Sequence, residues 1–149
     1  PNHPTQIIGV LDWEMATLGD PLMDLGSALA YWVEESDSAL FKATRRQPTN
    51  LKGMFTRKEV VDYYLEKTGL EVENWTFYEV FGIFRLAVIA QQIYYRYHHK
   101  QTNNPAFKDF WILIHALHIR ALKLIGLKKI EANEVAQKYI VKMKEILGK

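Results

Sequence analysis

The stretch GVLDWEMATLGDPLMDLG, from Gly9 to Gly26, carries the features that decide the fold. Its first part belongs to Gln6–Trp13, a short segment rich in β-branched residues, which predicts one buried strand. Its second part contains Asp20-Pro21, a helix N-cap followed by a proline in the first turn, and predicts a helix. A lone strand leaves its backbone groups unpaired, so we expect its partner upstream of residue 1 or in another chain.

The remainder of the sequence is typical of helices joined by loops. Thr56 with Glu59 forms a capping box at the start of a helix, and Gly69 ends that helix. The segment around residues 73–100 is apolar nearly all round, which predicts a buried central helix. Together these signals predict helices over residues 21–35, 56–69, 73–100, 105–126 and 131–147, with one helical turn at 39–43 inside a loop over 36–55.

Composition predicts one soluble globular domain. The chain has 149 residues, of which 48% are hydrophobic and 24% charged. Its net charge of +2 gives no support to a nucleic-acid or anionic-membrane partner, and no apolar run reaches the roughly 20 residues of a membrane span. Because cysteine is absent, disulfides and thiolate metal sites are excluded, and we expect a cytoplasmic location.

Asp12 is the first candidate for chemistry. It follows the predicted strand, where a carboxylate is held rigidly and faces open space. Such a group suits Mg²⁺, which takes one or two carboxylates and leaves its other positions to water and phosphates. Glu14 would supply a second oxygen or a hydrogen bond to a ligand of the ion. The spacing alone slightly favours a simpler interpretation, an aspartate that caps a turn at the end of a strand.

The pattern of two hydrophobic residues, Asp-Trp-Glu, Gly-Asp-Pro and Asp-Leu resembles the metal-binding segment of the aminoglycoside phosphotransferase and choline kinase superfamily. The branch associated with acyl-CoA dehydrogenases is the most similar. The resemblance is dense over Ile7–Leu29 and looser over residues 56–69 and at Phe84-Arg85. It implies a mainly α fold, the helical part of a protein-kinase-like C-terminal lobe with one short N-terminal strand or hairpin remnant.

The resemblance also implies roles for individual residues. Asp12 matches the aspartate that binds the Mg²⁺ ions bridging the phosphates of ATP, so Mg²⁺ and ATP are the expected cofactors. Asp20 and Asp24 match structural positions, a helix cap and a carboxylate that braces the active-site loops. Arg85 lies in an otherwise apolar helix, so we expect it to pair with Asp20 or Asp24; the alternative is that its stem reaches solvent.

The sequence also departs from the family pattern. It contains no His-Gly-Asp, the catalytic-loop motif that handles the proton of the substrate hydroxyl, and no glycine-rich phosphate loop. We therefore expect residues 1–149 to be a single domain, the C-terminal part of a phosphotransferase large lobe, with the N-lobe and catalytic loop absent. We expect this chain to be inactive alone.

Aromatic residues and histidines of the later helices are further candidates. The corresponding helices of the family help to form the substrate cleft, so Tyr94, Tyr97 and His118 are candidates for an acceptor pocket. His115 and His118 share a helical face, but without a third ligand they indicate core or groove histidines rather than zinc ligands.

The function expected is that of a C-terminal fragment of an ATP-dependent phosphotransferase acting on a small-molecule hydroxyl substrate. The alternative is a non-catalytic helical interaction or scaffold domain, with a homodimer formed through the surface exposed by truncation. Residues 94–100 mix aromatic and basic side chains, but aromatic packing explains them more simply than nucleic-acid binding. We expect no nucleic acid and no membrane as partner.

Overall fold

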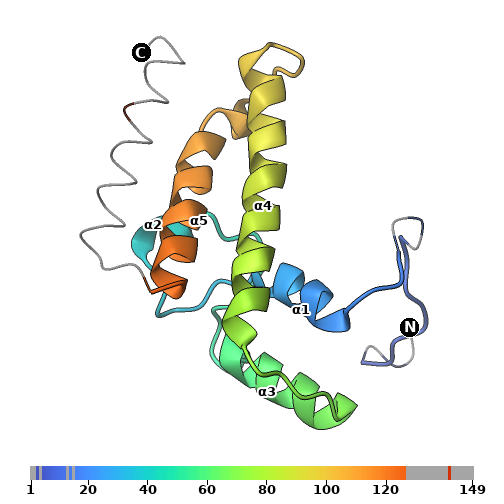
Figure 1. Ribbon diagram of the computed structural model, residues 1–149. Coiled ribbons are helices and arrows are strands. Elements are labelled where there is room, and N and C mark those ends of the chain that lie inside the picture. The colour runs from blue at the N-terminus through green and yellow to red at the C-terminus, as the bar shows by residue number, and fades with distance from the viewer. Residues whose placement is uncertain (1–2, 4, 13, 15, 127–140, 142–149) are drawn as a thin grey trace.

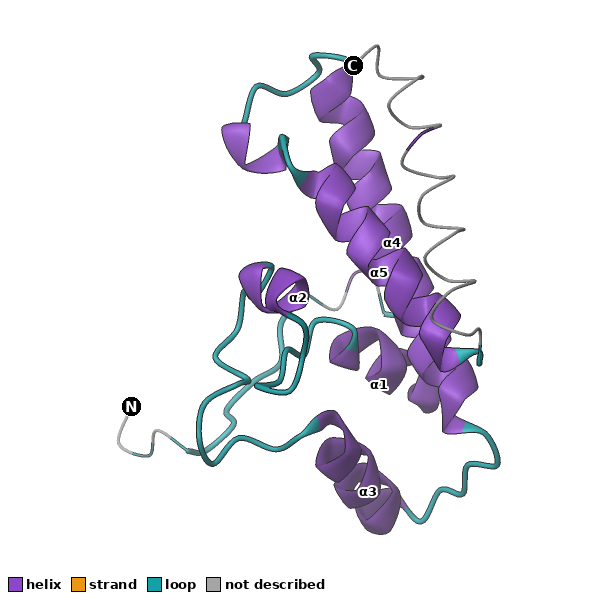
Figure 2. Ribbon diagram, turned by 90° about the vertical axis from the view of Figure 1, so that its left-hand side faces the viewer, coloured by secondary structure: helices purple, strands orange, loops and turns teal. Residues whose placement is uncertain are grey.

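The computed structural model describes residues 3, 5–12, 14, 16–126 and 141, and its regular elements are all helical (Figures 1 and 2). The mainly α class is thereby confirmed, and the helix expected over 131–147 lies outside the described residues. None of the described helices is both long and apolar enough to cross a membrane. The elements are α1 (Pro21–Leu29), α2 (Ala39–Ala43), α3 (Arg57–Thr68), α4 (Trp75–His98), the 3₁₀ helix η2 (Pro105–Phe107) and α5 (Phe110–Leu124).

The long helix α4 organises the molecule. It packs against α5 along one side and is crossed by α1 near its first half (Figure 1). The short helix α2 lies beside α5, and α3 lies near the start of α4. The N-terminal segment, residues 3, 5–12, 14 and 16–19, projects from the start of α1 away from the helices.

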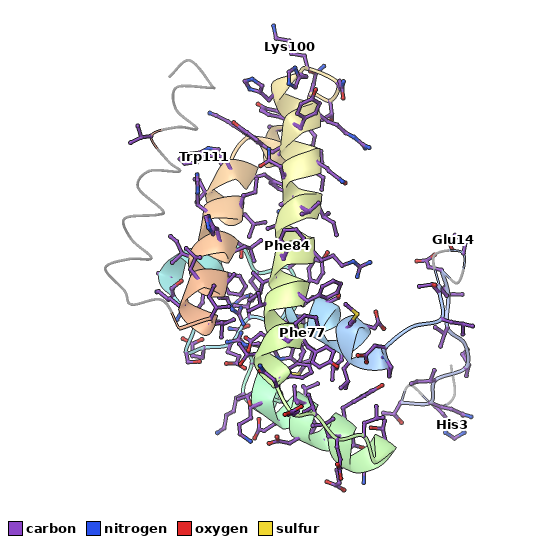
Figure 3. All side chains as sticks on the ribbon, in the orientation of Figure 1. His3, Glu14, Phe77, Phe84, Lys100 and Trp111 are labelled. Carbon is purple, nitrogen blue, oxygen red and sulfur yellow. The ribbon has the colours of Figure 1, made fainter. Side chains whose placement is uncertain are left out.

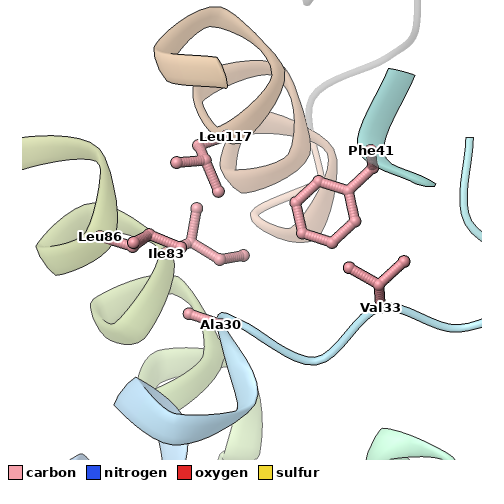
Figure 4. Close-up of a cluster of buried hydrophobic side chains, with 6 residues drawn as sticks. All are labelled: Ala30, Val33, Phe41, Ile83, Leu86 and Leu117. Carbon is pink, nitrogen blue, oxygen red and sulfur yellow. The ribbon is translucent and has the colours of Figure 1, made fainter. Parts of the chain in front are cut away.

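Buried side chains from the segment directly after α1 and from α2, α4 and α5 form the main core. Ile83 and Leu117 are the largest fully buried side chains, and burying groups of this size is the main favourable term in folding. Figure 4 shows how this core cluster converges from separate elements. Its buried members are Ala30, Val33, Phe41, Ile83, Leu86 and Leu117.

Glycine sets the distance between α1 and α4. A Cβ placed on Gly82 would lie 2.9 Å from the backbone nitrogen of Ser27 and closer still to the carbonyl oxygen of Gly26. A Cβ on Gly26 would likewise meet the backbone of Tyr78. The two helices therefore touch backbone to backbone, which only glycine permits at these positions.

The capping signals at α3 are confirmed. The Thr56 hydroxyl accepts from the Glu59 amide at 3.2 Å, and the Thr56 amide donates to the Glu59 carboxylate at 2.7 Å. The helix ends at Gly69, whose φ of 69° is left-handed and costs glycine little. The helical turn at residues 39–43 and the long helix near residues 73–100 are also confirmed, as α2 and α4.

The expected strand over residues 6–13 is wrong for residues 6–12, which form a loop without regular secondary structure. A strand needs a neighbour to pair its backbone groups, and no described segment pairs with this one. The Gln6 amide instead donates to the His3 carbonyl at 3.1 Å.

The first helix ends earlier than its apolar spacing predicts, at Leu29 rather than Glu35. The Thr49 hydroxyl binds the Val33 backbone twice, accepting from its amide at 3.0 Å and donating to its carbonyl at 2.8 Å. In a longer helix the amide and carbonyl of Val33 would form hydrogen bonds within the helix. Because they bind Thr49 instead, α1 does not continue through Val33.

The helix expected over residues 105–126 is divided. Pro105 begins only one 3₁₀ turn, η2, which Asn104 caps by accepting from the Ala106 amide at 3.0 Å. Asp109 then begins α5 as a new N-cap position, although its side chain makes no capping hydrogen bond.

The expectation that the central helix is buried on all sides is wrong for α4. Phe77 is 55% exposed and Phe84 is 63% exposed; both are labelled on α4 in Figure 3. Ile83, one residue before Phe84, is buried. Helices α1 and α5 cover only part of the circumference of α4, so the apolar residues on its remaining side face solvent.

Candidate functional site

Asp12 lies in the N-terminal segment with its side chain exposed and a φ of 61°. The left-handed region is costly for residues with a Cβ, by about 1–2 kcal/mol, and aspartate is among the few that enter it. Residues held in this region cluster at functional sites. Lys100, at the end of α4, shares this conformation with a φ of 57°, so the backbone at Asp12 supports a functional role only together with the position of the carboxylate.

Glu14 is exposed in the same segment, and Figure 3 shows its side chain at the outer edge, away from the helices. Within the described residues, no group of three or more His, Asp or Glu side chains lies close enough to hold a metal ion. The donors offered by Asp12 and Glu14 fit Mg²⁺, which needs only one or two protein carboxylates when phosphates and water complete its shell.

Asp20 connects the starts of two helices. Its Oδ1 accepts from the Leu22 amide at 2.9 Å, the expected capping bond, and its Oδ2 accepts from the Tyr78 hydroxyl at 2.8 Å. The hydrogen bond to Asp20 raises the pKa of Tyr78 above its usual range. The cap was predictable from Asp20-Pro21, whereas nothing in the sequence pointed to Tyr78 on α4 as its partner.

Asp24 and Arg85 are not brought together. Both side chains are exposed, and among the described residues neither takes part in an ion pair or side-chain hydrogen bond. The expected pairing of Arg85 with Asp20 or Asp24 is therefore wrong. Tyr78, two turns earlier on α4, makes the contact with Asp20, and Arg85 takes the alternative position in solvent.

The three candidate pocket residues do not line one pocket. Tyr94 is buried with Ala90 and Ile114 in a second core cluster, and burial raises its pKa. Tyr97 packs against that cluster. His118 instead lines a groove of about 480 Å³ between α4 and α5, which neither tyrosine lines.

An ion cluster that sequence reasoning missed connects the loop after α1 to the start of α3. Arg57 donates to both oxygens of Asp37, at 2.7 and 2.9 Å, and to the Trp32 carbonyl at 2.8 Å. Glu34 lies 3.1 Å from the guanidinium and also accepts from the Arg57 amide. Burial raises the pKa of Asp37, but hydrogen bonds from Arg57 and from the Glu34 amide outweigh it, so its pKa lies below the usual range.

A second partly buried ion pair connects α5 to α4. Arg120 on α5 donates to Glu79 on α4 at 3.0 Å, and its guanidinium lies 4.8 Å from the ring centre of Phe41. Such contacts join α2, α4 and α5 by charge as well as by packing. No spacing in the sequence indicates either pairing, because the partners are 20 and 41 residues apart.

Comparison with known proteins finds a family that resembles the first part of the chain. Residues 2–59 match the model of the phosphotransferase enzyme family. This part of the chain is similar to that family. The match includes Asp12, Glu14, Asp20 and Asp24, and it ends at the start of α3. The resemblance to phosphotransferases over Ile7–Leu29 is thereby confirmed.

Relatives of this chain are named as members of the acyl-CoA dehydrogenase family. Acyl-CoA dehydrogenase family member 10 of Mus musculus is 39% identical over 98 residues, which is 63% of this chain and 9% of that protein. Family member 11 is 31% identical over 99 residues in Mus musculus and over 100 residues in Homo sapiens, covering 64% of this chain and 13% and 12% of those proteins. The chain thus spans about a tenth of the length of these relatives. No solved structure matches it significantly.

Proposed function

We propose that this chain is the C-terminal part of an ATP-dependent phosphotransferase that acts on a hydroxyl group of a small molecule. The observation that carries the proposal is the family match over residues 2–59, which includes an exposed aspartate, Asp12, with a left-handed backbone. The exposed carboxylate of Asp12 is open to solvent, so it is free to take a ligand.

In this proposal Asp12 would hold Mg²⁺, and Glu14 would add a second oxygen or a hydrogen bond to another ligand of the ion. When bound, Mg²⁺ neutralises the charge of the ATP phosphates that develops during transfer. Asp20 fixes where the loop ends, because its two oxygens tie the start of α1 to Tyr78 on α4. The loop that carries Asp12 is therefore anchored at Asp20, where α1 begins.

The proposal assigns the step at the acceptor hydroxyl to residues outside this chain. His-Gly-Asp, which would supply the group that accepts the hydroxyl proton, does not occur in the sequence. The chain alone is thus proposed to be inactive, and its lack of cysteine favours the cytoplasm.

Phosphoryl transfer tests the proposal directly. ATP-dependent phosphorylation of a panel of hydroxyl-bearing metabolites would be measured for this chain and for the product of its complete open reading frame. Asp12→Asn is the test variant, and Asp62→Asn, at an exposed carboxylate paired with Lys58 on α3, is the matched control. Activity of the longer product that Asp12→Asn removes and Asp62→Asn spares supports the proposal. Silence of both proteins, or activity untouched by Asp12→Asn, contradicts it.

A second candidate function, a helical interaction domain, is favoured by apolar side chains in the N-terminal segment. Ile7, Ile8 and Leu11 are 83%, 88% and 85% exposed. Exposed apolar patches of this kind mark association sites, and self-association would cover these side chains. Sedimentation of the chain over a range of concentrations would show a monomer–dimer equilibrium that Ile8→Ser with Leu11→Ser weakens. A monomer at every concentration excludes this homodimer.

A further inference from the structure

An apolar cavity of about 400 Å³ lies between α2, α4 and α5, on the opposite side of α4 from the N-terminal segment (Figure 1). Its floor is the main core, including Val33, Phe41 and Leu86, which Figure 4 shows converging from three parts of the chain. Ile89 and Ile93 extend its wall along α4. A concave, largely apolar space of this size is typical of sites for small organic molecules, which measure roughly 300–1,000 Å³.

Polar groups gather at the edge of this cavity rather than inside it. Arg46 lines it and is exposed, and no ion pair among the described residues uses its guanidinium. Asp109 lines it at the start of α5, and its side chain does not cap the helix. The edge therefore offers one uncommitted cation beside an apolar interior.

We propose that this cavity binds an amphiphilic carboxylate, with the apolar chain against α4 and the carboxylate on Arg46. A guanidinium suits this head group because it donates two parallel hydrogen bonds to one carboxylate. A methylene takes up roughly the 30 Å³ that one water molecule has in the liquid, so about 400 Å³ holds a chain of roughly ten carbons together with a head group. The site shares no residue with the Asp12 segment and does not depend on phosphoryl transfer.

Three ten-carbon probes that differ only in their head group test this assignment. The 149-residue chain would be titrated calorimetrically with decanoate, 1-decanol and decyltrimethylammonium, each below its micelle concentration. Decanoate is expected to bind at one site, about tenfold more tightly than decanol, with the ammonium weakest, because charged hydrogen bonds are about twice as strong as neutral ones. Absence of saturable decanoate binding, or equally tight binding of the ammonium, overturns the proposal.

Variants locate the binding. Arg46→Gln is expected to reduce decanoate affinity to that of decanol, and Lys52→Gln, at an exposed cation outside the cavity, to leave both unchanged. Ala106→Trp, on the exposed rim at η2, is expected to weaken both probes at least tenfold by occupying the opening. If circular dichroism shows Ala106→Trp to be unfolded, the two charge variants decide alone. Decanoate affinity unaltered by Arg46→Gln, or equally weakened by Lys52→Gln, refutes the site.

Discussion

The crossing of α1 and α4 depends on Gly82, and Gly82→Ala tests how much of the fold rests on it. A Cβ there would lie 2.9 Å from the Ser27 nitrogen, about 0.5 Å inside ordinary van der Waals contact, and closer still to the Gly26 carbonyl oxygen. Both obstructing atoms belong to the backbone, so no side-chain rotation relieves the overlap. The helices must separate, and the core cluster next to the crossing loosens with them.

The expected loss follows from two opposing effects. In an open helix, replacing glycine by alanine stabilises by about 0.5–1 kcal/mol, because alanine loses less backbone entropy on folding. Overpacking a tight site costs about 1–3 kcal/mol, and the high end applies where backbone meets backbone. Partial loss of contacts around Ile83 adds to this cost. We expect Gly82→Ala to lower the free energy of unfolding by about 2–3 kcal/mol and the Tm by roughly 5–10 °C.

Urea unfolding followed by circular dichroism measures this loss, with Gly19→Ala as the control. Gly19 lies in the loop before α1, and a Cβ there would meet no atom within 4 Å. Its change is expected to stay within about 0.5 kcal/mol. Gly82→Ala with wild-type stability would refute the reasoning, as would an equal loss in both variants.

Three further substitutions test the packing and the charges. Leu117→Ala empties a fully buried position and is expected to cost about 3 kcal/mol in urea unfolding, whereas Leu18→Ala, at a fully exposed position, should cost less than about 0.5 kcal/mol. Thr56→Ala removes the capping bond of α3 and is expected to cost about 1 kcal/mol; an unchanged unfolding midpoint would show the cap to be dispensable. Asp37→Asn breaks the paired contact with Arg57 and is expected to cost about 2 kcal/mol at pH 7, because the pair is only partly shielded from water. Since folding lowers the pKa of Asp37, its contribution is complete above the ordinary carboxyl pKa of 3.8 and is lost as the pH falls toward the lower folded value. Between pH 5 and pH 2 the free energy of unfolding of the wild type should therefore fall more than that of Asp37→Asn, because only the wild type has this titrating carboxyl. If the free energies of unfolding of the two proteins change in parallel with pH, the ion-pair assignment is contradicted.

Helix ends were predictable where one short stretch of sequence contains all the partners. Thr56 with Glu59, Asp20 with Pro21, and Gly69 each act within four residues, and each was confirmed as a cap or helix end. The same local signals could not show that the Thr49 hydroxyl binds the Val33 backbone and so prevents α1 from continuing, because the two residues are 16 positions apart. A strand likewise depends on a partner elsewhere in the fold, because its backbone groups must pair with a neighbouring strand. The β-branched residues at positions 6–12 were therefore not enough to form one.

In the candidate site, too, residues within one short stretch of sequence were predictable and contacts across the fold were not. Asp12 was identifiable because it lies in a recognisable linear pattern, and the family match includes it. Partners that meet across the fold, such as Tyr78 with Asp20 and Arg57 with Asp37, gave no signal in the sequence. The sequence predicted a buried, paired Arg85 for a related reason, whereas the side chain is exposed. Its neighbours on α4 are apolar, but the side of the helix that carries it is left uncovered.

The central claim is that Asp12 is the metal-binding aspartate of a phosphotransferase. Its most direct test is the Mg²⁺ dependence of ATP turnover by the product of the complete open reading frame, with Asp12→Asn compared against Asp62→Asn. We expect Asp12→Asn to lower turnover by at least about 100-fold, a loss typical for removing a group that supports transition-state charge, and Asp62→Asn to keep the wild-type rate. Equal turnover by Asp12→Asn and wild type at every Mg²⁺ concentration would contradict it.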